Sequence, residues 1–387
     1  MSPTVVKTAR ATNAGVAASR LKVDMSDTLY KLEDDEGALL VTANVLGKER
    51  AAGFEVQWHA SELRPKFVTM AASASAASGS IDILESEALQ VNDLLIVPST
   101  QETLLVTART DADTYAVTRS WGTTAAANIP AAEQILIIHA HYDEGASLVD
   151  GRTVTETLYK NNVALWRDNF KITGTLQAIG QAGGLYHGND VDLQRRDMTL
   201  VHKRGINHAC IYSEYGSSGT RRSISGAIEF IEDNGSSRTD STSAMTFAAF
   251  MALSQTMTRY NGRKMAGIVS RQFASVVSQW ALNETVQVQI GAKMFGLAVM
   301  DITTPHGQFR LLVDDALEGA TFKKFGIFLS TDKKGGPRWR YLRDTMLLKD
   351  RQEDDEDAYE EEILTEATIE WGNANFHFLF KNVQSAS

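Results

Sequence analysis

The sequence predicts an α+β fold that is divided into more than one subdomain. Apolar segments are strand-sized, as in Leu94–Val97 and Ile135–Ile138. Helical periodicity is confined to a few stretches, and helices and strands are mixed without a regular strand–helix–strand alternation. At 387 residues the chain is about two to three times the common domain size, which favours two or three subdomains.

The composition is that of an average soluble globular protein, with 43% hydrophobic and 22% charged residues. It excludes disordered, collagen-like and disulfide-stapled chains. The single cysteine, Cys210, cannot form an intrachain disulfide, which favours a reducing compartment. No apolar run reaches the roughly 18 residues of a membrane span, and residues 1–21 have no apolar signal core. We therefore expect neither a membrane span nor secretion.

Charge is distributed unevenly along this acidic chain. A net charge of −10 makes the chain a poor candidate for gripping a nucleic-acid backbone. Residues 1–22 carry basic side chains and no acid, which predicts an extended, basic N-terminal arm. The run Asp350–Glu362 holds 9 acids against Arg351 alone. Such a run predicts either a solvated surface or a site for a cation or a basic partner, although it lacks the glycine of an EF-hand.

The N-terminal half predicts a compact β unit behind a flexible joint. Lys48–His59 and Phe67–Met70 are expected strands, and the small-residue spacer Ala71–Ser80 is typical of a joint. Within Ile81–His141, turn residues separate four expected strands: Leu94–Val97, Thr103–Thr107, Tyr115–Arg119 and Gln134–His139. This spacing predicts a small barrel or sandwich, which is too small to be stable without a host domain.

The C-terminal half predicts three helices and several strands. The first helix runs from Asp190 to about Glu214, with an apolar stripe formed by Val191, Leu193, Met198, Val201, Ile206 and Ala209. Its basic positions are expected to face solvent or neighbours: Arg195, Arg196, Lys203 and Arg204. The others are Ser241–Tyr260 and a helix capped by Ser270. Expected strands include Met265–Val269, Gln308–Val313 and Phe325–Leu329, and a final hairpin joins Thr365–Trp371 to Phe376–Lys381.

Candidate chemistry along the chain is weak. His139, His141 and Glu144 have a spacing that could hold a metal, but a strand-end surface is the simpler interpretation. Gly180–Gly188 could present backbone N–H groups to an anion, yet it lacks the ending of a phosphate loop. His208 and Cys210 diverge on a helix and do not form a nucleophile–base pair. We expect no catalytic, cofactor-binding or metal-binding residue.

The order of these elements resembles a known family. Several tracts precede the long helix in a characteristic order. The first runs from Val91–Leu95 through Tyr115–Ala125 to Glu144–Gly145, and it is followed by Asn169–Phe170, Thr173–Thr175 and Ala182–Gly184. The tail Thr365–Val383 closes the pattern. In this order they resemble a tailed-bacteriophage major capsid protein of the Hong Kong 97 type. More narrowly, they resemble the branch with a small β-barrel inserted in the extended loop.

The resemblance implies a domain organisation for nearly the whole chain after about residue 25. Residues 1–35 would be an N-terminal arm, and 36–175 an extended loop whose β-barrel insertion spans about 81–141. Residues 176–230 would form the peripheral domain with its long spine helix. Residues 231–345 would form the axial domain, and 346–387 would be strands that return to the peripheral domain. We also expect no long coiled-coil extension at the N-terminus, which favours a separate scaffolding protein.

The resemblance also implies a function. The chain would be a structural subunit, not an enzyme, that self-assembles as hexamers and pentamers into an icosahedral head around the double-stranded DNA of a tailed phage. Its partners would be itself, the scaffolding protein and a portal, with no sequence-specific DNA binding and no membrane. Whether a decoration protein is needed stays open. The head would assemble in the host cytoplasm and remain as the virion capsid. Two alternatives are another virion component, such as a tail or decoration protein, and a metal-dependent hydrolase.

Overall fold

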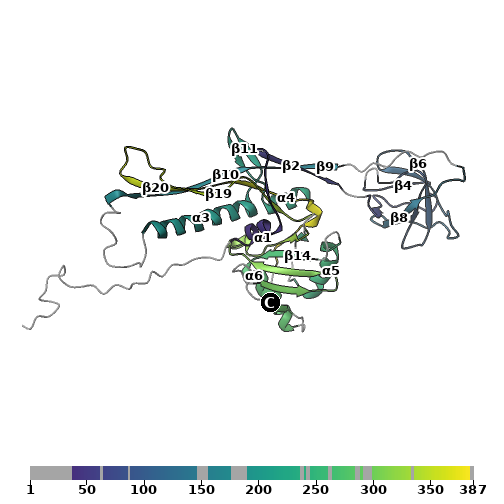
Figure 1. The fold of residues 1–387 in the computed structure, drawn as a ribbon. Coiled ribbons are helices and arrows are strands. Elements are labelled where there is room, and N and C mark those ends of the chain that lie inside the picture. The colour runs from purple at the N-terminus through teal and green to yellow at the C-terminus, as the bar shows by residue number, and fades with distance from the viewer. Residues whose placement is uncertain are drawn as a thin grey trace, which may run out of the picture. The chain divides into compact units, whose positions relative to one another are not determined.

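Figure 1 shows the fold of the chain in a computed structural model. It describes residues 37–61, 64–85, 88–145, 156–175, 190–235, 239–240, 245–259, 264–283, 288–290, 299–332 and 335–383. The chain divides into two compact units. Unit 1 comprises residues 1–58 and 158–387, and unit 2 comprises residues 59–157. Strands β2 (Glu55–Ser61) and β9 (Glu156–Asn162) pair with each other at the boundary. The mixed α+β class predicted from the sequence is confirmed.

Unit 1 contains two larger sheets. The four-stranded sheet has the order β1 (Lys48–Arg50), β19 (Arg338–Leu348), β20 (Ala358–Glu370) and β10 (Ala164–Thr173). Helix α3 (Asp190–Tyr212) lies along β10 and β20, as Figure 1 shows. A short hairpin of β11 (Gly216–Ser218) and β12 (Arg221–Ser223) follows α3, and α4 (Ala227–Asn234) comes next.

The second sheet of unit 1 has seven strands. Its order is β13 (Thr239–Asp240), β21 (Phe378–Lys381), β18 (Gly326–Ser330), β14 (Lys264–Val269), β17 (Gln308–Val313), β16 (Val299–Thr303) and β15 (Val288–Ile290). The remaining helical elements are α1 (Ala38–Leu46), α5 (Phe247–Met257), α6 (Arg271–Asn283), α7 (Gly319–Phe322) and the 3₁₀ turn η3 (Ala374–Phe376). Ser270 caps α6 as predicted, because its hydroxyl accepts from the Phe273 N–H at 3.1 Å.

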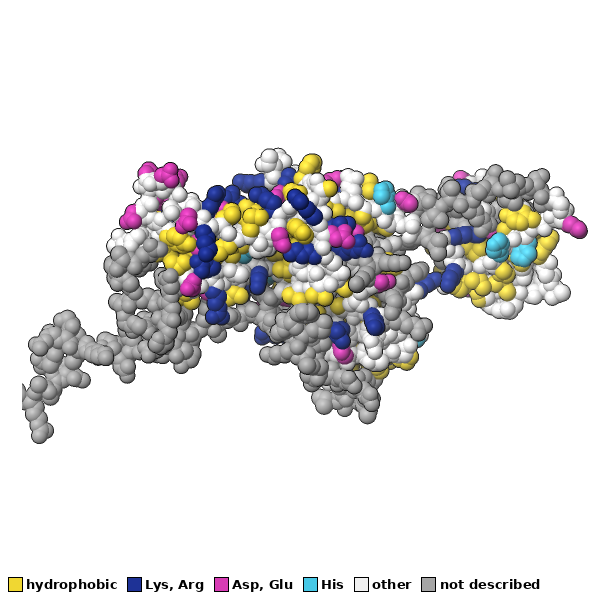
Figure 2. Space-filling view, viewed as in Figure 1, with side chains coloured by type: hydrophobic (Ala, Val, Ile, Leu, Met, Phe, Trp, Pro, Cys, Tyr) yellow, Lys and Arg dark blue, Asp and Glu magenta, His cyan; other side chains and the backbone are white. Residues whose placement is uncertain are grey.

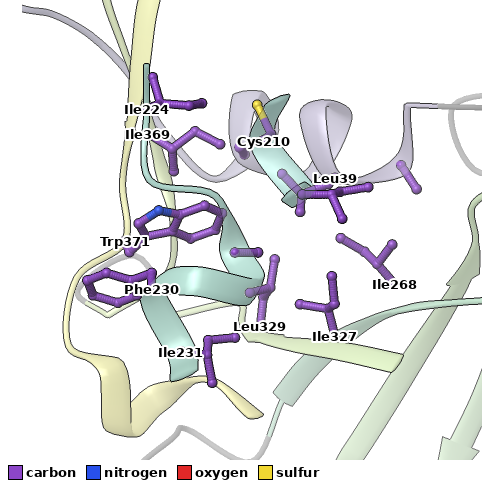
Figure 3. Packing of buried hydrophobic residues seen from close by; sticks show 14 of the residues in the cluster. Leu39, Cys210, Ile224, Phe230, Ile231, Ile268, Ile327, Leu329, Ile369 and Trp371 are labelled. Atoms are coloured by element: carbon purple, nitrogen blue, oxygen red, sulfur yellow. The ribbon is translucent and has the colours of Figure 1, made fainter. Parts of the chain in front are cut away.

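Strand alternation gives the seven-stranded sheet two apolar faces. In β18, Ile327 and Leu329 join one buried cluster, whereas Phe328 between them joins the other. The first cluster contains residues from α1, α3, α4 and both larger sheets, and Figure 3 shows Phe230 and Trp371 close together in it, with Leu39, Cys210 and Ile268 nearby. The second cluster packs α5 and α6 against aromatic side chains: Phe309, Phe328, Phe378 and Phe380. One sheet thus binds two layers of the unit together.

Unit 2 is built around a six-stranded sheet. Its order is β3 (Phe67–Thr69), β8 (Gln134–Ala140), β5 (Asp93–Ile96), β6 (Thr103–Arg109), β7 (Thr114–Thr118) and β4 (Ser80–Asp82). The end strands β3 and β4 are also linked to each other, because the Leu84 N–H donates to the Thr69 carbonyl at 2.9 Å. The interior is a closed apolar cluster that includes Leu95, Leu104 and Tyr115, each 0% exposed. Four strands therefore lie where the sequence predicted them.

A buried ion pair fixes the loops of unit 2. The Arg119 guanidinium donates to both carboxylate oxygens of Glu102 at 2.8 Å, and also to the carbonyls of Ser75 and Ala127. Arg119 lies at the end of β7, and Ser75 lies in the spacer 71–80. The spacer, which was expected to be a flexible joint, is therefore held to the sheet at this point. Burial raises the pKa of Glu102, but the Arg119 bonds and two backbone N–H donors outweigh it, so the pKa is lowered.

The long helix is confirmed in position, but its predicted stripe is partly wrong. Helix α3 spans Asp190–Tyr212, close to the predicted 190–214. Met198 and Ile206 are buried as expected, whereas Val201 is 57% exposed. The buried side of the helix instead includes the polar residue His202, and Arg195 reaches a buried partner rather than solvent. The stripe was assigned from apolar residue type alone, so the inward positions of Arg195 and His202 were missed.

The predicted C-terminal hairpin is also wrong. Strands β20 and β21 follow each other in sequence but belong to different sheets. After Trp371 the chain passes through η3 and enters the seven-stranded sheet beside β18. The buried His377 marks this crossing: its Nε2 lies 2.6 Å from the Trp371 carbonyl oxygen. Burial lowers the pKa of His377 to about 4, so the imidazole is neutral at pH 7.

The structure groups some predicted regions differently from the expected domains. Helix α1, β1 and β10 lie in unit 1, although residues 36–175 were expected to form one extended loop. The N-terminal arm, residues 1–35, lies outside the described residues. The domain names and limits given above stay predictions. Among the described residues, no helix combines the length and apolarity needed to cross a bilayer.

Two aspartate substitutions on α3 test which side of the helix is buried. Met198→Asp places a carboxylate at a position that is 7% exposed, whereas Val201→Asp places it at one that is 57% exposed. We expect Met198→Asp to lower the free energy of unfolding by more than about 3 kcal/mol, because it buries an unpaired charge. Val201→Asp should cost about 1 kcal/mol or less, mainly through helix propensity. Urea unfolding of the two variants measures this, and equal losses would contradict the assignment.

Candidate functional site

Strand β20 carries glutamates on both of its faces. Because side chains alternate along a strand, Glu360, Glu362, Glu366 and Glu370 share one face, and Glu361 lies on the other. We call these the outer face and the helix face of the four-stranded sheet. Helix α3 packs on the helix face, where it bonds to the odd-numbered residues of β20. The site therefore has two polar layers separated by the sheet backbone.

On the helix face, Arg195 of α3 forms a two-pronged ion pair with Glu361. Its Nε lies 2.7 Å from Oε2, its Nη2 lies 2.6 Å from Oε1, and the Glu361 side chain is 0% exposed. Arg195 lowers the pKa of Glu361 against the opposing effect of burial, and the hydroxyl of Tyr359 helps by donating to the same carboxylate. For the same reason the pKa of Tyr359 is raised. This arrangement suits a permanent structural bond.

A second polar link on the helix face centres on His202. Its Nδ1 lies 2.6 Å from Oδ2 of Asp168, and its Nε2 lies 2.8 Å from Oγ1 of Thr365. The Thr365 hydroxyl lies 2.9 Å from that of Thr345. An Asp–His–hydroxyl series can activate a nucleophile. Thr365 is 0% exposed, however, so it cannot reach a substrate. The series instead ties α3 to β10, β20 and β19.

On the outer face, arginines from the neighbouring strands cover the glutamates of β20. Arg167 of β10 pairs with Glu362, Arg343 of β19 donates to Glu366 at 2.7 Å, and Arg340 donates to Glu370 at 2.6 Å. Arg167 lowers the pKa of Glu362 despite burial. Figure 2 shows basic side chains gathered on the part of unit 1 that these strands occupy in Figure 1. The result is a polar surface on which opposite charges are matched.

This pairing corrects the interpretation of the acidic run Asp350–Glu362. Glu361 and Glu362 are not solvated, since their residues are 0% and 5% exposed. They belong to β20, and their basic partners come from the same chain. The segment 353–357 is exposed and forms the turn before the strand. The sequence showed that the run needed counterions, but it could not identify them.

The metal-site hypothesis is not supported by the arrangement of its residues. His139, His141 and Glu144 are exposed, and each histidine Nδ1 lies 3.0 Å from a backbone carbonyl oxygen of its own segment. In the described part of the chain, no three His, Cys, Asp or Glu side chains are grouped as metal ligands would be. The glycine-rich stretch Gly180–Gly188 lies outside the described residues.

The pairing of His208 with Cys210 is likewise not formed. Cys210 is 0% exposed, and burial raises the pKa of its thiol well above the ordinary value. The His208 ring lies 6.1 Å from the ring of Tyr212 in an edge-to-face arrangement. A buried, protonated thiol packs as a small apolar group. This agrees with the expectation that His208 and Cys210 do not form a nucleophile–base pair.

One structurally important residue was missed by sequence reasoning. Asp314 is 0% exposed and caps α1 from a distant part of the chain. Its Oδ2 accepts from the Ala38 N–H at 2.8 Å, and Asn207 of α3 donates to the same oxygen at 3.1 Å. This single carboxylate joins α1, α3 and the end of β17. Its sequence signal is weak because the partners lie 276 and 107 residues away.

Removal of the Arg195 side chain tests how much the helix-face ion pair contributes to the free energy of unfolding. Arg195→Ala leaves the Glu361 carboxylate buried without its guanidinium, and we expect a loss of about 3 kcal/mol in the free energy of unfolding. Lys203→Ala, an exposed position on the same helix, should change it by no more than about 0.5 kcal/mol. Adding Glu361→Gln to Arg195→Ala should recover part of the loss, because the buried charge is gone. Denaturant unfolding of wild type and the three variants measures these free energies. A double variant that is less stable than Arg195→Ala would contradict this account.

Comparison with solved structures identifies the fold. The capsid of a native GTA particle has 9% sequence identity and a TM-score of 0.54, covering 97% of this chain and 100% of that chain. A chain of Microbacterium phage Oxtober96 has 8% identity and a TM-score of 0.52, covering 97% and 99%. Identities this low establish a shared fold alone. No curated protein matches the sequence.

A comparison with protein families establishes more than the fold. The model of the SU10 major capsid protein family matches residues 6–384, which is nearly the whole chain. The expected role as a structural capsid subunit rather than an enzyme is therefore confirmed, and the tail, decoration and hydrolase alternatives are set aside. The polar layers around β20 accordingly stabilise a subunit of a shell. The chain belongs to the SU10 major capsid protein family.

Proposed function

We propose that copies of this chain associate as hexamers and pentamers and close into an icosahedral head around the double-stranded DNA genome of a tailed phage. The observation that supports this most strongly is the family match over residues 6–384. The fold shared with the GTA capsid, over 97% of this chain and 100% of that chain, agrees with it. A net charge of −10 would also keep packaged DNA from adhering to the shell wall, since phosphates and carboxylates repel each other.

We assign parts of the subunit by this proposal. The paired strands β2 and β9 together with unit 2 are the extended loop, and the six-stranded sheet is its small β-barrel insertion. Support comes from the closeness of the two strands at the unit boundary, where His59 Nδ1 lies 3.4 Å from Glu156 Oε2. Helix α3 and the four-stranded sheet form the peripheral domain, and the seven-stranded sheet with α5 and α6 forms the axial domain. We expect the N-terminal arm, residues 1–35, whose first 22 residues carry bases and no acid, to reach a neighbouring copy.

The proposed partners follow from the same role. A separate scaffolding protein guides assembly, a portal occupies one vertex, and the head forms in the host cytoplasm before it becomes the virion capsid. Contact with DNA is non-specific. The matched charges of the outer face support a subunit that packs against neighbours without a large single-sign field.

Electron microscopy of the expressed chain tests the proposal directly. We expect closed icosahedral shells, formed by the chain alone or after addition of the scaffolding protein. The Arg195→Ala variant should give fewer shells, because a destabilised subunit is lost to aggregation. Tubes or small rings as the only product in both conditions would contradict the assignment of this chain as the shell subunit.

A deletion tests the role of unit 2. Strands β2 and β9 are paired, so residues 62–155 can be replaced by a short glycine–serine linker without straining unit 1. We expect the shortened subunit to fold with a thermal midpoint within a few degrees of that of unit 1 in the full chain. Shell yield or shell stability should fall, because the extended loop no longer reaches a neighbour. Shells as abundant and as heat-resistant as wild type would refute an assembly role for unit 2.

A further inference from the structure

A row of large apolar side chains crosses four neighbouring strands on the outside of unit 2. The strand order β3, β8, β5 and β6 brings these residues together. Phe67 lies opposite Leu136, Leu136 lies opposite Ile96, and in the next row Leu94 lies opposite Leu105. Residues opposite each other on adjacent strands share one face of a sheet. These five side chains therefore form one continuous surface.

The surface points away from the core of unit 2. The sequence neighbours Val68, Leu95, Leu104 and Ile135 are each 0% exposed and fill the interior. Because successive side chains of a strand point to opposite faces, the five residues face outward. Ile138, which adjoins the register shift between β5 and β8, is 48% exposed, and Phe67 is 37% exposed. We call these six residues the outer apolar patch: Phe67, Leu94, Ile96, Leu105, Leu136 and Ile138.

The outer apolar patch carries no charge. The side chains that continue its rows are Thr103, opposite Ile96, and Thr118, opposite Leu105. The exposed His139 lies opposite Leu94. In Figure 2, hydrophobic and histidine side chains lie next to each other on the visible face of unit 2. The outward face of an antiparallel sheet is ordinarily polar, and a contiguous apolar surface marks a contact with another molecule.

The charge of the chain favours a second copy of this chain as the occupant of the patch. Two copies that each carry a net charge of −10 repel each other overall. At the outer apolar patch they can meet without desolvating a charge or placing like charges together. The same uncharged surface on both copies is self-complementary, as a two-fold contact requires. Members of this family are capsid subunits, so further copies are present at high local concentration.

We propose that the outer apolar patch of one copy packs against the same patch of a second copy. This rests on the proposed function, in which many copies form one shell. The contact joins subunits through unit 2, and it is separate from the ion-paired outer face of unit 1. It accounts for the large apolar side chains on strands whose interior is already filled.

Opposite charges at one central position test the contact. Leu136 lies between Phe67 and Ile96, so Leu136→Lys or Leu136→Glu places like charges on both sides of a two-fold contact. Each variant alone should fold with a thermal midpoint near that of wild type, but its shell yield should fall by about tenfold or more. A 1:1 mixture of the two variants should recover most of the yield, because Lys then meets Glu. Ala131→Lys, at an exposed turn of the same unit, is the matched control and should assemble normally.

Sedimentation of unassembled chains separates this proposal from the proposed function. In the mixture the two Leu136 variants should form dimers while each alone stays monomeric, whether or not shells form. If wild type forms this dimer but forms no shells, either alone or with the scaffolding protein, the proposed function is overturned and the patch is supported. Normal shells from both single variants would overturn the patch as a contact. If the single variants assemble poorly and their mixture neither dimerises nor assembles, the contact between two copies of the patch is overturned. The outer apolar patch would then bind a different partner.

Discussion

Burial of β20 on both of its faces is the constraint on which the rest of unit 1 depends. From Glu361 to Ile369 every residue of this strand is buried, although three of them are glutamates. A buried carboxylate is stable only with a charged or hydrogen-bonding partner. Helix α3 supplies Arg195 on one face, and β10 and β19 supply Arg167 and Arg343 on the other. The position of α3 and the register of both neighbouring strands are thus tied to one strand.

The seven-stranded sheet connects β20 and α3 to the rest of unit 1. Its alternating residues enter two apolar clusters, and one of these clusters also contains residues of α3 and of β20. Ile206 and Cys210 lie on the buried side of α3 beyond its polar half. The helix is therefore held by charges near its start and by apolar contacts near its end. Asp314 fixes α1 against the same assembly of elements.

Much of this fold could be predicted from the sequence, and the failures have physical causes. The ends of α3 and most strands of unit 2 were predicted because turn residues and periodicity are local signals. Helix α1 was not predicted, since its cap comes from Asp314, 276 residues away. Val201 was assigned to the buried stripe because it is apolar. Arg195 and His202 were not assigned to it because they are polar, although both point inward. Nor could the sequence pair Arg195 with Glu361, which are 166 residues apart.

Cys210 has a practical consequence for work on this protein. It is the single cysteine of the chain, it is 0% exposed, and burial holds its thiol in the protonated form. Maleimides and other thiol reagents need an accessible thiolate, so the native subunit presents them with no ready target. A cysteine introduced at any chosen exposed position would then be the sole reactive thiol of each subunit. Fluorophores or cargo could be attached at one defined point per copy without first mutating the native residue.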